Sequence, residues 1–459
     1  MKSHSALTPF VLGLLVIFLL GLLSALPPFQ IGSLHFKRVD PLASVRQDPK
    51  PKWIDIPFPE LDSIQATIDS VAKESKETCR PGITCIEDYS PDSTALDNFL
   101  KAMVALKKKK KTVRVAFYGD SFIEGDVFCG NVRDTLQTLY GGRGVGFVPI
   151  TSNVTGFRNT IKHAYDRYKT YSIVTKKDST DFVQMGPAGY SFRPLEENWV
   201  EYKVSRQRYL GEFSEMRLYY RNVGDAVLHY TFNDSVNGSI PLKRTRKLRE
   251  WRYNKPSTKA VAYKFEQPDS LQLYGASFEN GEGIYVDNFS MRGNSGIGLD
   301  AIEPSTFKEF NNYRDYKLII LQYGLNVVGT DSGRYNWYAN RMITVIEKIK
   351  KAFPKASILL MSVSDKSVNE DGSFRTVQTI PALRNTQRDI AQKTGIAFWD
   401  LFEAMGGENS MVRFVEAEPA LAAKDYTHLT FRGGRKLAGK LVNSLLFELE
   451  RFEKTNKIK

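Results

Sequence analysis

The chain has 459 residues, which allows two or three domains. A hydrophobic content of 42% and a charged content of 25% are ordinary for a folded protein and exclude a disordered chain. The net charge of +13 favours an acidic partner such as nucleic acid, anionic lipid or an anionic polymer. The sequence has no CxxC pair and no His/Cys cluster, so we predict no metal and no cofactor.

The N-terminus carries an apolar run from Leu7 to Leu26, which is long enough to span a bilayer. Lys2 precedes this run, so residues 1–26 are predicted to be a cytoplasmic tip and an uncleaved transmembrane anchor. A cleaved signal peptide is the alternative, but the run ends in a poor cleavage site. This predicts a single-pass protein of the cell inner membrane, with the rest of the chain in the periplasm or outside the cell, and disfavours nucleic acid as a partner.

Residues 27–112 are predicted to be a stalk followed by one helix, over residues 93–106. Cys79 and Cys85 flank a turn, and they either close a small disulfide loop in an oxidising compartment or remain free thiols. The run from Lys107 to Lys111 is interpreted as a solvated helix end, where cations suit the helix dipole. Contact with an anionic polymer or lipid is the alternative.

A short β-rich strand over 113–118 leads into Gly119-Asp120-Ser121, and a helix is predicted over 127–140. The sequence pattern changes over residues 151–283, where short β-rich runs alternate with Gly, Asn, Asp and Pro. This spacing predicts an all-β sandwich. The β-rich runs are residues 199–204, 216–221, 226–232, 260–265 and 270–275.

One segment of this β region is strongly basic. Residues 243–249 carry five cations and lie near Trp251. The simpler interpretation is an exposed loop. The alternative is a surface for a glycan or an anionic polymer, on which the aromatic ring stacks against sugar and the cations meet acids.

After residue 284 the alternation of strands and helices returns, which predicts a mostly parallel sheet. The predicted strands cover 317–322, 357–362 and 397–400, and the predicted helices cover 334–352, 380–394 and 432–452. We therefore predict one α/β domain made of residues 113–150 and 284–459. The β-sandwich of residues 151–283 is inserted into it.

Three residues have the chemistry of a nucleophilic triad. Ser121 lies at the carboxyl end of a predicted strand, where ligands meet open α/β sheets. Asp425 lies three residues before His428, just ahead of a predicted helix, so both side chains can lie on one side of a turn. His428 is the only histidine in the C-terminal α/β part. The acid can then orient the histidine, which takes the serine proton.

Two further strand ends carry groups that suit the same crevice. Asn326 follows the strand 317–322 and can aim its side-chain amide there. Gly296 follows the β-rich run 283–289, and a glycine lets a backbone N–H approach a reacting oxygen. Each of these sites alone is a common turn. Their occurrence at strand ends in this order is much more specific.

The order of these sites resembles the SGNH hydrolase superfamily, whose four sequence blocks carry Ser, Gly, Asn and His. The matching residues are Ser121 in GDS, Gly296 in NSG, Asn326 in YGLN and His428 in DYTH, with Asp425 as the third triad member. The resemblance covers residues 113–150 and 284–450. It implies a flavodoxin-like, three-layer fold around a parallel sheet, with an oxyanion hole made of Ser121, Gly296 and Asn326. Phe122 stands where the GDSL consensus has Leu.

A narrower resemblance is to the periplasmic peptidoglycan O-acetylesterases, in which a carbohydrate-binding-like β-sandwich is inserted into the SGNH domain. The stretch GDSFIEGD, the segment 141–149 and the segment 380–407 carry it. It implies a membrane-anchored serine esterase that removes O-acyl groups, in particular O-acetyl groups, from an envelope glycan. An acylated polysaccharide or peptidoglycan is then the partner.

Two alternatives stay open: an O-acyltransferase that uses the same triad, and a glycan-binding protein with a vestigial site. For all of these functions the position of the insertion is the same. One end of it follows the sequence block of Ser121, and the other end precedes the block of Gly296. We therefore expect the insertion to approach the Ser121 crevice.

Overall fold

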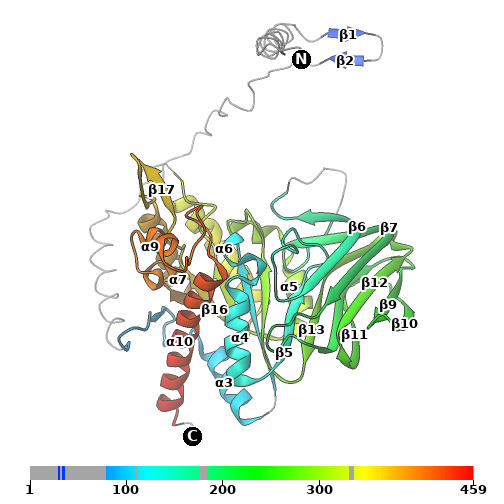
Figure 1. Ribbon diagram of the computed structural model, residues 1–459, viewed down its shortest axis with the longest axis horizontal. Coiled ribbons are helices and arrows are strands. Elements are labelled where there is room, and N and C mark those ends of the chain that lie inside the picture. The colour runs from blue at the N-terminus through cyan, green and yellow to red at the C-terminus, as the bar shows by residue number, and fades with distance from the viewer. Residues whose placement is uncertain are drawn as a thin grey trace, which may run out of the picture. The chain divides into compact units, whose positions relative to one another are not determined.

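The computed structural model describes residues 29–31, 34–36, 79–109, 111–175, 183–329 and 335–457 (Figure 1). The chain divides into two compact units, residues 1–70 and 71–459. In the first unit, β1 (Phe29–Ile31) and β2 (Leu34–Phe36) pair antiparallel. The predicted transmembrane segment, residues 7–26, lies outside the described residues. Among the helices that are described, none is long and apolar enough to cross a bilayer.

The second unit is built on a parallel sheet. In the described part of the chain this sheet has six strands in the order β14-β4-β15-β16-β19-β3, of which β3 alone runs antiparallel to its neighbour. Numbered along the chain, the five parallel strands have the order 2-1-3-4-5 of flavodoxin-like folds. The predicted mixed α/β fold with a parallel sheet is therefore confirmed. The strands are β3 (Ile86–Asp88), β4 (Thr112–Gly119), β14 (Gly283–Ser290), β15 (Tyr316–Gln322), β16 (Ser357–Met361) and β19 (Ala397–Trp399).

Helices pack on this sheet in two groups. Helix α10 packs against α3 and α4, and α6 packs against α5 and α7 (Figure 1). Right-handed crossovers between parallel strands place the two groups on opposite faces of the sheet. The central strands are covered on both faces, which explains their continuous apolar sequences. The helices are α3 (Asp97–Lys108), α4 (Cys129–Tyr140), α5 (Pro304–Arg314), α6 (Asn336–Ala352), α7 (Ile380–Thr394), α8 (Leu401–Met405), α9 (Ser410–Glu416) and α10 (Phe431–Thr455).

The inserted segment forms a second, antiparallel sheet. Its nine described strands follow the order β10-β9-β12-β7-β13-β8-β11, with β5 also paired to β13 and β6 to β7. Rings of β9 and β11, from opposite halves of this order, meet at 5.3 Å (Tyr230 to Trp251) and 4.9 Å (Phe232 to Tyr253). The sheet therefore folds over on itself around one hydrophobic cluster. The strands are β5 (Arg143–Val148), β6 (Lys162–Ser172), β7 (Tyr190–Lys203), β8 (Phe213–Asn222), β9 (Val227–Phe232), β10 (Val236–Pro241), β11 (Thr245–Thr258), β12 (Ala260–Glu266) and β13 (Leu271–Asn280).

This second sheet differs from the arrangement predicted from the sequence in three respects. The described strands are linked into one continuous sheet where Phe192 of β7 pairs with Leu273 of β13, so the predicted sandwich of two sheets is not confirmed. Strand β5, from the predicted segment 113–150, pairs with β13 of the antiparallel sheet. The basic run over 243–249 enters β11, an edge strand, and is not an exposed loop throughout.

The two sheets are fastened together by buried ion pairs. Glu279 at the end of β13 binds Arg114 of β4 at 2.5 Å and Arg314 of α5 at 2.6 Å. Arg314 also binds Asp287 of β14 at 2.6 Å, and both of these side chains are fully buried. Removing one partner of such a pair leaves a buried charge without compensation. The buried ion pairs therefore connect β13 of the antiparallel sheet to β4 of the parallel sheet and to α5.

The segment before the parallel sheet is fixed to the C-terminal helix. Cys79 and Cys85 form a disulfide. Arg80 pairs with Glu450 at 2.9 Å, and Lys107 pairs with Glu453 at 2.7 Å. The pairing of Lys107 fits the interpretation of this basic run as a solvated helix end.

Candidate active site

Three neighbouring strands of the parallel sheet end level with one another. Gly119 at the end of β4 pairs with Ser290 at the end of β14 and with Gln322 at the end of β15. The blocks that contain Ser121, Gly296 and Asn326 follow these three strands directly. The structure therefore places the three blocks at one edge of the sheet, where open α/β folds bind ligands.

Ser121 opens a short 3₁₀ turn, η1 (Ser121–Asp126), whose start is held by Asp120. One carboxylate oxygen of Asp120 accepts the backbone N–H of Phe122 at 2.9 Å, and the other accepts the side-chain amide of Asn326 at 3.3 Å. Burial raises the pKa of Asp120 to about 7, although these hydrogen bonds act in the opposite direction. Asp120 thus links the Ser block to the Asn block next to Ser121.

The other end of this turn is locked by Asp126. Its carboxylate binds Arg133 of α4 at 3.1 Å and Arg158 at 2.8 Å, and it accepts hydrogen bonds from Thr160 and Asn288. Burial alone would raise the pKa of Asp126, but the two guanidinium groups hold it well below its usual range. Arg158 and Thr160 belong to the inserted segment. The start of the insertion, just before β6, therefore contacts the far end of the Ser121 turn, and the approach of the strands of the insertion to the Ser121 crevice stays a prediction.

The predicted Ser, His and Asp side chains form one hydrogen-bonded chain. Ser121 Oγ lies 2.9 Å from His428 Nε2, and His428 Nδ1 lies 2.7 Å from Asp425 Oδ2. Asp425 Oδ1 also accepts the backbone N–H groups of Thr427 and His428, both at 3.0 Å. Burial raises the pKa of Asp425, but these hydrogen bonds outweigh it and keep the pKa below its usual value. An ionised carboxylate accepts only, so Nδ1 carries the proton and Nε2 is free to accept from the serine hydroxyl.

Close packing of α10 brings the histidine to the serine. A Cβ added at Gly434, in the first turn of α10, would lie 1.9 Å from the carbonyl oxygen of Val127, the residue that follows η1. Thr430 caps the helix by accepting the N–H of Gly433. The helix that begins just after His428 thus packs directly on the end of η1, the turn that begins at Ser121.

A small hairpin supports the loop that carries Asp425 and His428. It consists of β17 (Ser367–Glu370) and β18 (Ser373–Thr376). The N–H of Ser367 donates to the carbonyl of Tyr426 at 3.0 Å, and the ring of Phe374 stacks on the ring of Tyr426 at 3.6 Å. Tyr426 has a φ of 52°, a strained value for a residue with a side chain. We infer that the hairpin stabilises this conformation.

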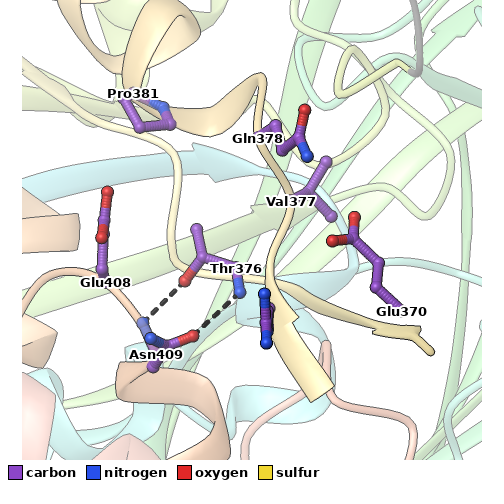
Figure 2. Close-up of a pocket in the computed structure, with 8 residues that line it drawn as sticks. Glu370, Thr376, Val377, Gln378, Pro381, Glu408 and Asn409 are labelled. Carbon is purple, nitrogen blue, oxygen red and sulfur yellow. Dashed lines mark hydrogen bonds between the residues drawn. The ribbon is translucent and has the colours of Figure 1, made fainter. Parts of the chain in front are cut away.

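A cavity of about 340 Å³ lies at the base of the hairpin (Figure 2). Two hydrogen bonds between Thr376 and Asn409, at 3.1 and 2.7 Å, close one side of it. Its other lining residues are Glu370, Arg375, Val377, Gln378, Pro381 and Glu408. None of these eight residues belongs to the Ser–His–Asp chain, so this cavity is separate from the candidate site.

No family model and no curated protein matches the sequence. Among solved structures, a peptidoglycan O-acetylesterase is similar with a TM-score of 0.65 and 19% identity, over 80% of this chain and 99% of its own length. The chain shares the fold of this solved structure. The resemblance seen in the sequence is thereby confirmed at the level of the fold.

Two carbohydrate esterases of family two are matched more weakly. The protein from Cellvibrio japonicus has a TM-score of 0.26 and 9% identity, over 66% of this chain and 98% of its own. The protein from Clostridium thermocellum, solved with cellohexaose, has a TM-score of 0.25 and 10% identity, over 63% and 99%. At these scores neither adds to the fold assignment.

Two of the three predicted oxyanion donors are already hydrogen-bonded within the protein. The N–H of Gly296 donates to the side chain of Asn294 at 2.9 Å, and the amide of Asn326 donates to the carbonyl of Asn294 at 3.0 Å. The roles of Gly296 and Asn326 therefore stay predictions, and each requires that an arriving oxygen displaces one of these bonds. Gly293, in the same block, has open space beside its Cα and a φ of 78°.

Sequence reasoning missed several residues of this site. Asn294 joins the Gly block to the Asn block, but an asparagine in a turn carries no signal of that role. Glu124 lies three residues after Ser121, and its carboxylate binds Arg292 at 2.5 Å. Burial raises the pKa of Glu124, while Arg292 and His428 act in the opposite direction, so the carboxylate lies within electrostatic reach of His428.

The described residues contain no group of three or more His, Cys, Asp or Glu side chains that could hold a metal ion. The site holds the Ser121 hydroxyl, the His428 ring and the ionised Asp425 carboxylate, joined in this order by hydrogen bonds. His428 Nε2 can accept the hydroxyl proton. This arrangement can activate the hydroxyl for attack on an electrophilic carbon.

Proposed function

We propose that the protein is a serine esterase that removes O-acyl groups, in particular O-acetyl groups, from an envelope glycan. One observation carries the proposal. The hydrogen-bonded chain from Ser121 through His428 to Asp425 lies at the carboxyl edge of a flavodoxin-like sheet. The similarity in fold to a peptidoglycan O-acetylesterase supports the choice of an O-acetylated glycan as the substrate.

In the proposed reaction, Ser121 Oγ attacks the carbonyl carbon of the acyl group while His428 Nε2 takes the hydroxyl proton. Asp425 keeps the Nδ1 proton in place and stabilises the imidazolium that forms. The tetrahedral intermediate collapses, His428 returns the proton to the departing sugar hydroxyl, and the acyl group stays on Ser121. Water then repeats the sequence and releases the carboxylic acid.

The oxyanion of the intermediate requires donors. Asn326 and Gly296 are candidates once the oxyanion replaces Asn294 as their acceptor, and the N–H of Ser121 is the third. Donors of this kind are each worth roughly 3–4 kcal/mol of transition-state stabilisation.

Exposure of the site favours hydrolysis over acyl transfer. The side chain of His428 is 31% exposed and that of Asp425 is 50% exposed, so solvent reaches the base directly. A transferase must keep water from the acyl-enzyme until the acceptor sugar arrives. An open base is better suited to a reaction in which water is the acceptor.

We further propose that residues 7–26 anchor the enzyme in the inner membrane, with the body of the protein in the periplasm or outside the cell. The apolar sequence of this run and the preceding Lys2 support the proposal.

Acetate release from O-acetylated peptidoglycan and O-acetylated xylan tests the proposed activity. The wild-type protein should release acetate, and Ser121→Ala should lower the rate by about 10⁶-fold, because triad nucleophiles contribute that much. Unchanged release by Ser121→Ala would remove Ser121 from the mechanism. Wild-type protein that binds these polymers without releasing acetate would point to a vestigial site. Transfer of acetyl to an added sugar, in preference to water, would point to a transferase.

A further inference from the structure

Two exposed side chains of different chemistry are fixed to the turn that carries the nucleophile. Arg292 binds Glu124, and Phe157 lies over Gly125, the next residue of η1. Neither belongs to the Ser–His–Asp chain. The turn that presents Ser121 therefore also carries a cation and an aromatic ring.

The aromatic ring is held by a glycine that admits no side chain. A Cβ at Gly125 would lie 2.1 Å from Phe157 Cε2, and Gly125 has a φ of 64°. Both observations require glycine, so the ring packs directly against the backbone of the turn. Phe157 remains 45% exposed. A ring fixed on one side and exposed on the other presents an apolar surface of the kind on which the C–H face of a pyranose packs.

The cation is held by a carboxylate that is itself mostly buried. The Glu124 side chain is 10% exposed, whereas the Arg292 side chain is 61% exposed. Among the described residues, Glu124 is the acidic partner of Arg292, and one guanidinium nitrogen makes the contact. A guanidinium has five N–H donors, so donors remain for a carboxylate from outside the protein. The buried Glu124 fixes the direction in which they point.

We propose that Phe157 and Arg292 form an acidic-sugar subsite beside Ser121, where the ring stacks on a sugar and the guanidinium binds its carboxylate. The preferred substrates are then O-acylated glycans with a carboxylate on the acylated sugar or on its neighbour. The inference rests on the proposed esterase site, because it uses the position of the subsite next to the nucleophile. It also agrees with the net charge of +13.

Binding to an inactive variant tests this subsite without relying on turnover. In a Ser121→Ala background, calorimetry compares an O-acetylated oligogalacturonide with the same oligomer after its carboxylates are reduced to alcohols. The parent should prefer the carboxylated oligomer. Arg292→Gln should weaken its binding about tenfold and leave the reduced oligomer much less affected, since one charge-assisted hydrogen bond is lost. Arg292→Lys should restore part of the preference, because it keeps the charge without the planar fork. Phe157→Ala should weaken both oligomers by similar factors.

Matched controls come from the antiparallel sheet. Arg167 of β6 is 52% exposed and pairs with Glu197, so Arg167→Gln removes an arginine of similar exposure and should leave both affinities unchanged. Trp199 of β7 is 41% exposed, so Trp199→Ala is the control for Phe157→Ala and should leave both affinities unchanged. A parent that binds neither oligomer, or binds both equally, overturns the subsite, as does equal weakening of both oligomers by Arg292→Gln. If the carboxylate preference holds but wild-type protein releases no acetate from any oligomer, the subsite stands and the esterase function fails.

Discussion

The contact between α10 and the nucleophile turn can be tested by a single methyl group. In Gly434→Ala the new Cβ would lie 1.9 Å from the Val127 carbonyl oxygen, whereas an ordinary contact begins at 3.4 Å. The oxygen is backbone, so no side-chain rotation relieves the clash. The helix and the turn must separate by roughly 1.5 Å, and the 2.9 Å contact between Ser121 and His428 spans this junction. A displacement of about 1 Å in an active site can cost about 100-fold in rate. We therefore expect kcat/KM for p-nitrophenyl acetate to fall by about that factor.

The free energy of unfolding should change by less than the activation free energy in this variant. Overpacking costs about 1–3 kcal/mol, and the gain in helix propensity from Gly to Ala returns about 1 kcal/mol. The matched control is Gly439→Ala in the same helix, where a Cβ meets nothing within 4 Å. That variant should be slightly more stable and fully active. Urea denaturation and ester hydrolysis on both proteins give the comparison. If Gly434→Ala folds and hydrolyses the ester at the wild-type rate, the proposed seating of α10 is wrong.

One further prediction concerns a carboxylate of the same turn. Asp126→Asn should lower the free energy of unfolding by about 3–5 kcal/mol at neutral pH, because Arg133 and Arg158 lose their buried counter-charge. The pKa of Asp126 is held low in the folded protein, so its stabilisation is complete above the ordinary value of 3.8 and is lost as the pH falls. The gap between variant and wild type should accordingly narrow in acid, and a gap independent of pH in urea titrations would contradict this.

The parallel sheet is predictable from the sequence because strands that are buried on both faces need apolar residues at nearly every position. Strands such as β4 and β15 are covered on both faces, and their unbroken apolar sequences mark them directly. The polar residues that follow them must meet at the carboxyl edge, since neighbouring parallel strands end together. This is why the sequence alone suffices to place Ser121 and Asn326 near each other.

The elements that escape sequence reasoning depend on contacts between distant segments. The start of β11 resembles a loop in sequence because a register shift between Thr245 and Arg249 breaks the alternation of its side chains. The sequence does not indicate which sheet β5 joins, because its partner, β13, lies far along the chain. The stacking of Phe374 on Tyr426 cannot be predicted from the sequence. The two hairpin strands are short and polar, and they show no regular alternation of apolar and polar residues. Phe157 is a single aromatic residue in a loop, so its sequence context does not indicate where it packs. Its ring lies against the backbone of Gly125, where a side chain would clash with it.

The separation of Ser121 and His428 along the chain has a consequence for biosynthesis. The two residues are 307 positions apart in the sequence, and all described strands of the antiparallel sheet lie between them along the chain. A nascent chain therefore exposes its serine long before the histidine that activates it has been translated. Contacts of such sequence separation form late and slowly. In the proposed mechanism the serine remains a weak nucleophile until α10 docks, so the first hydrolytic turnover would report that the C-terminal helix has reached its final position.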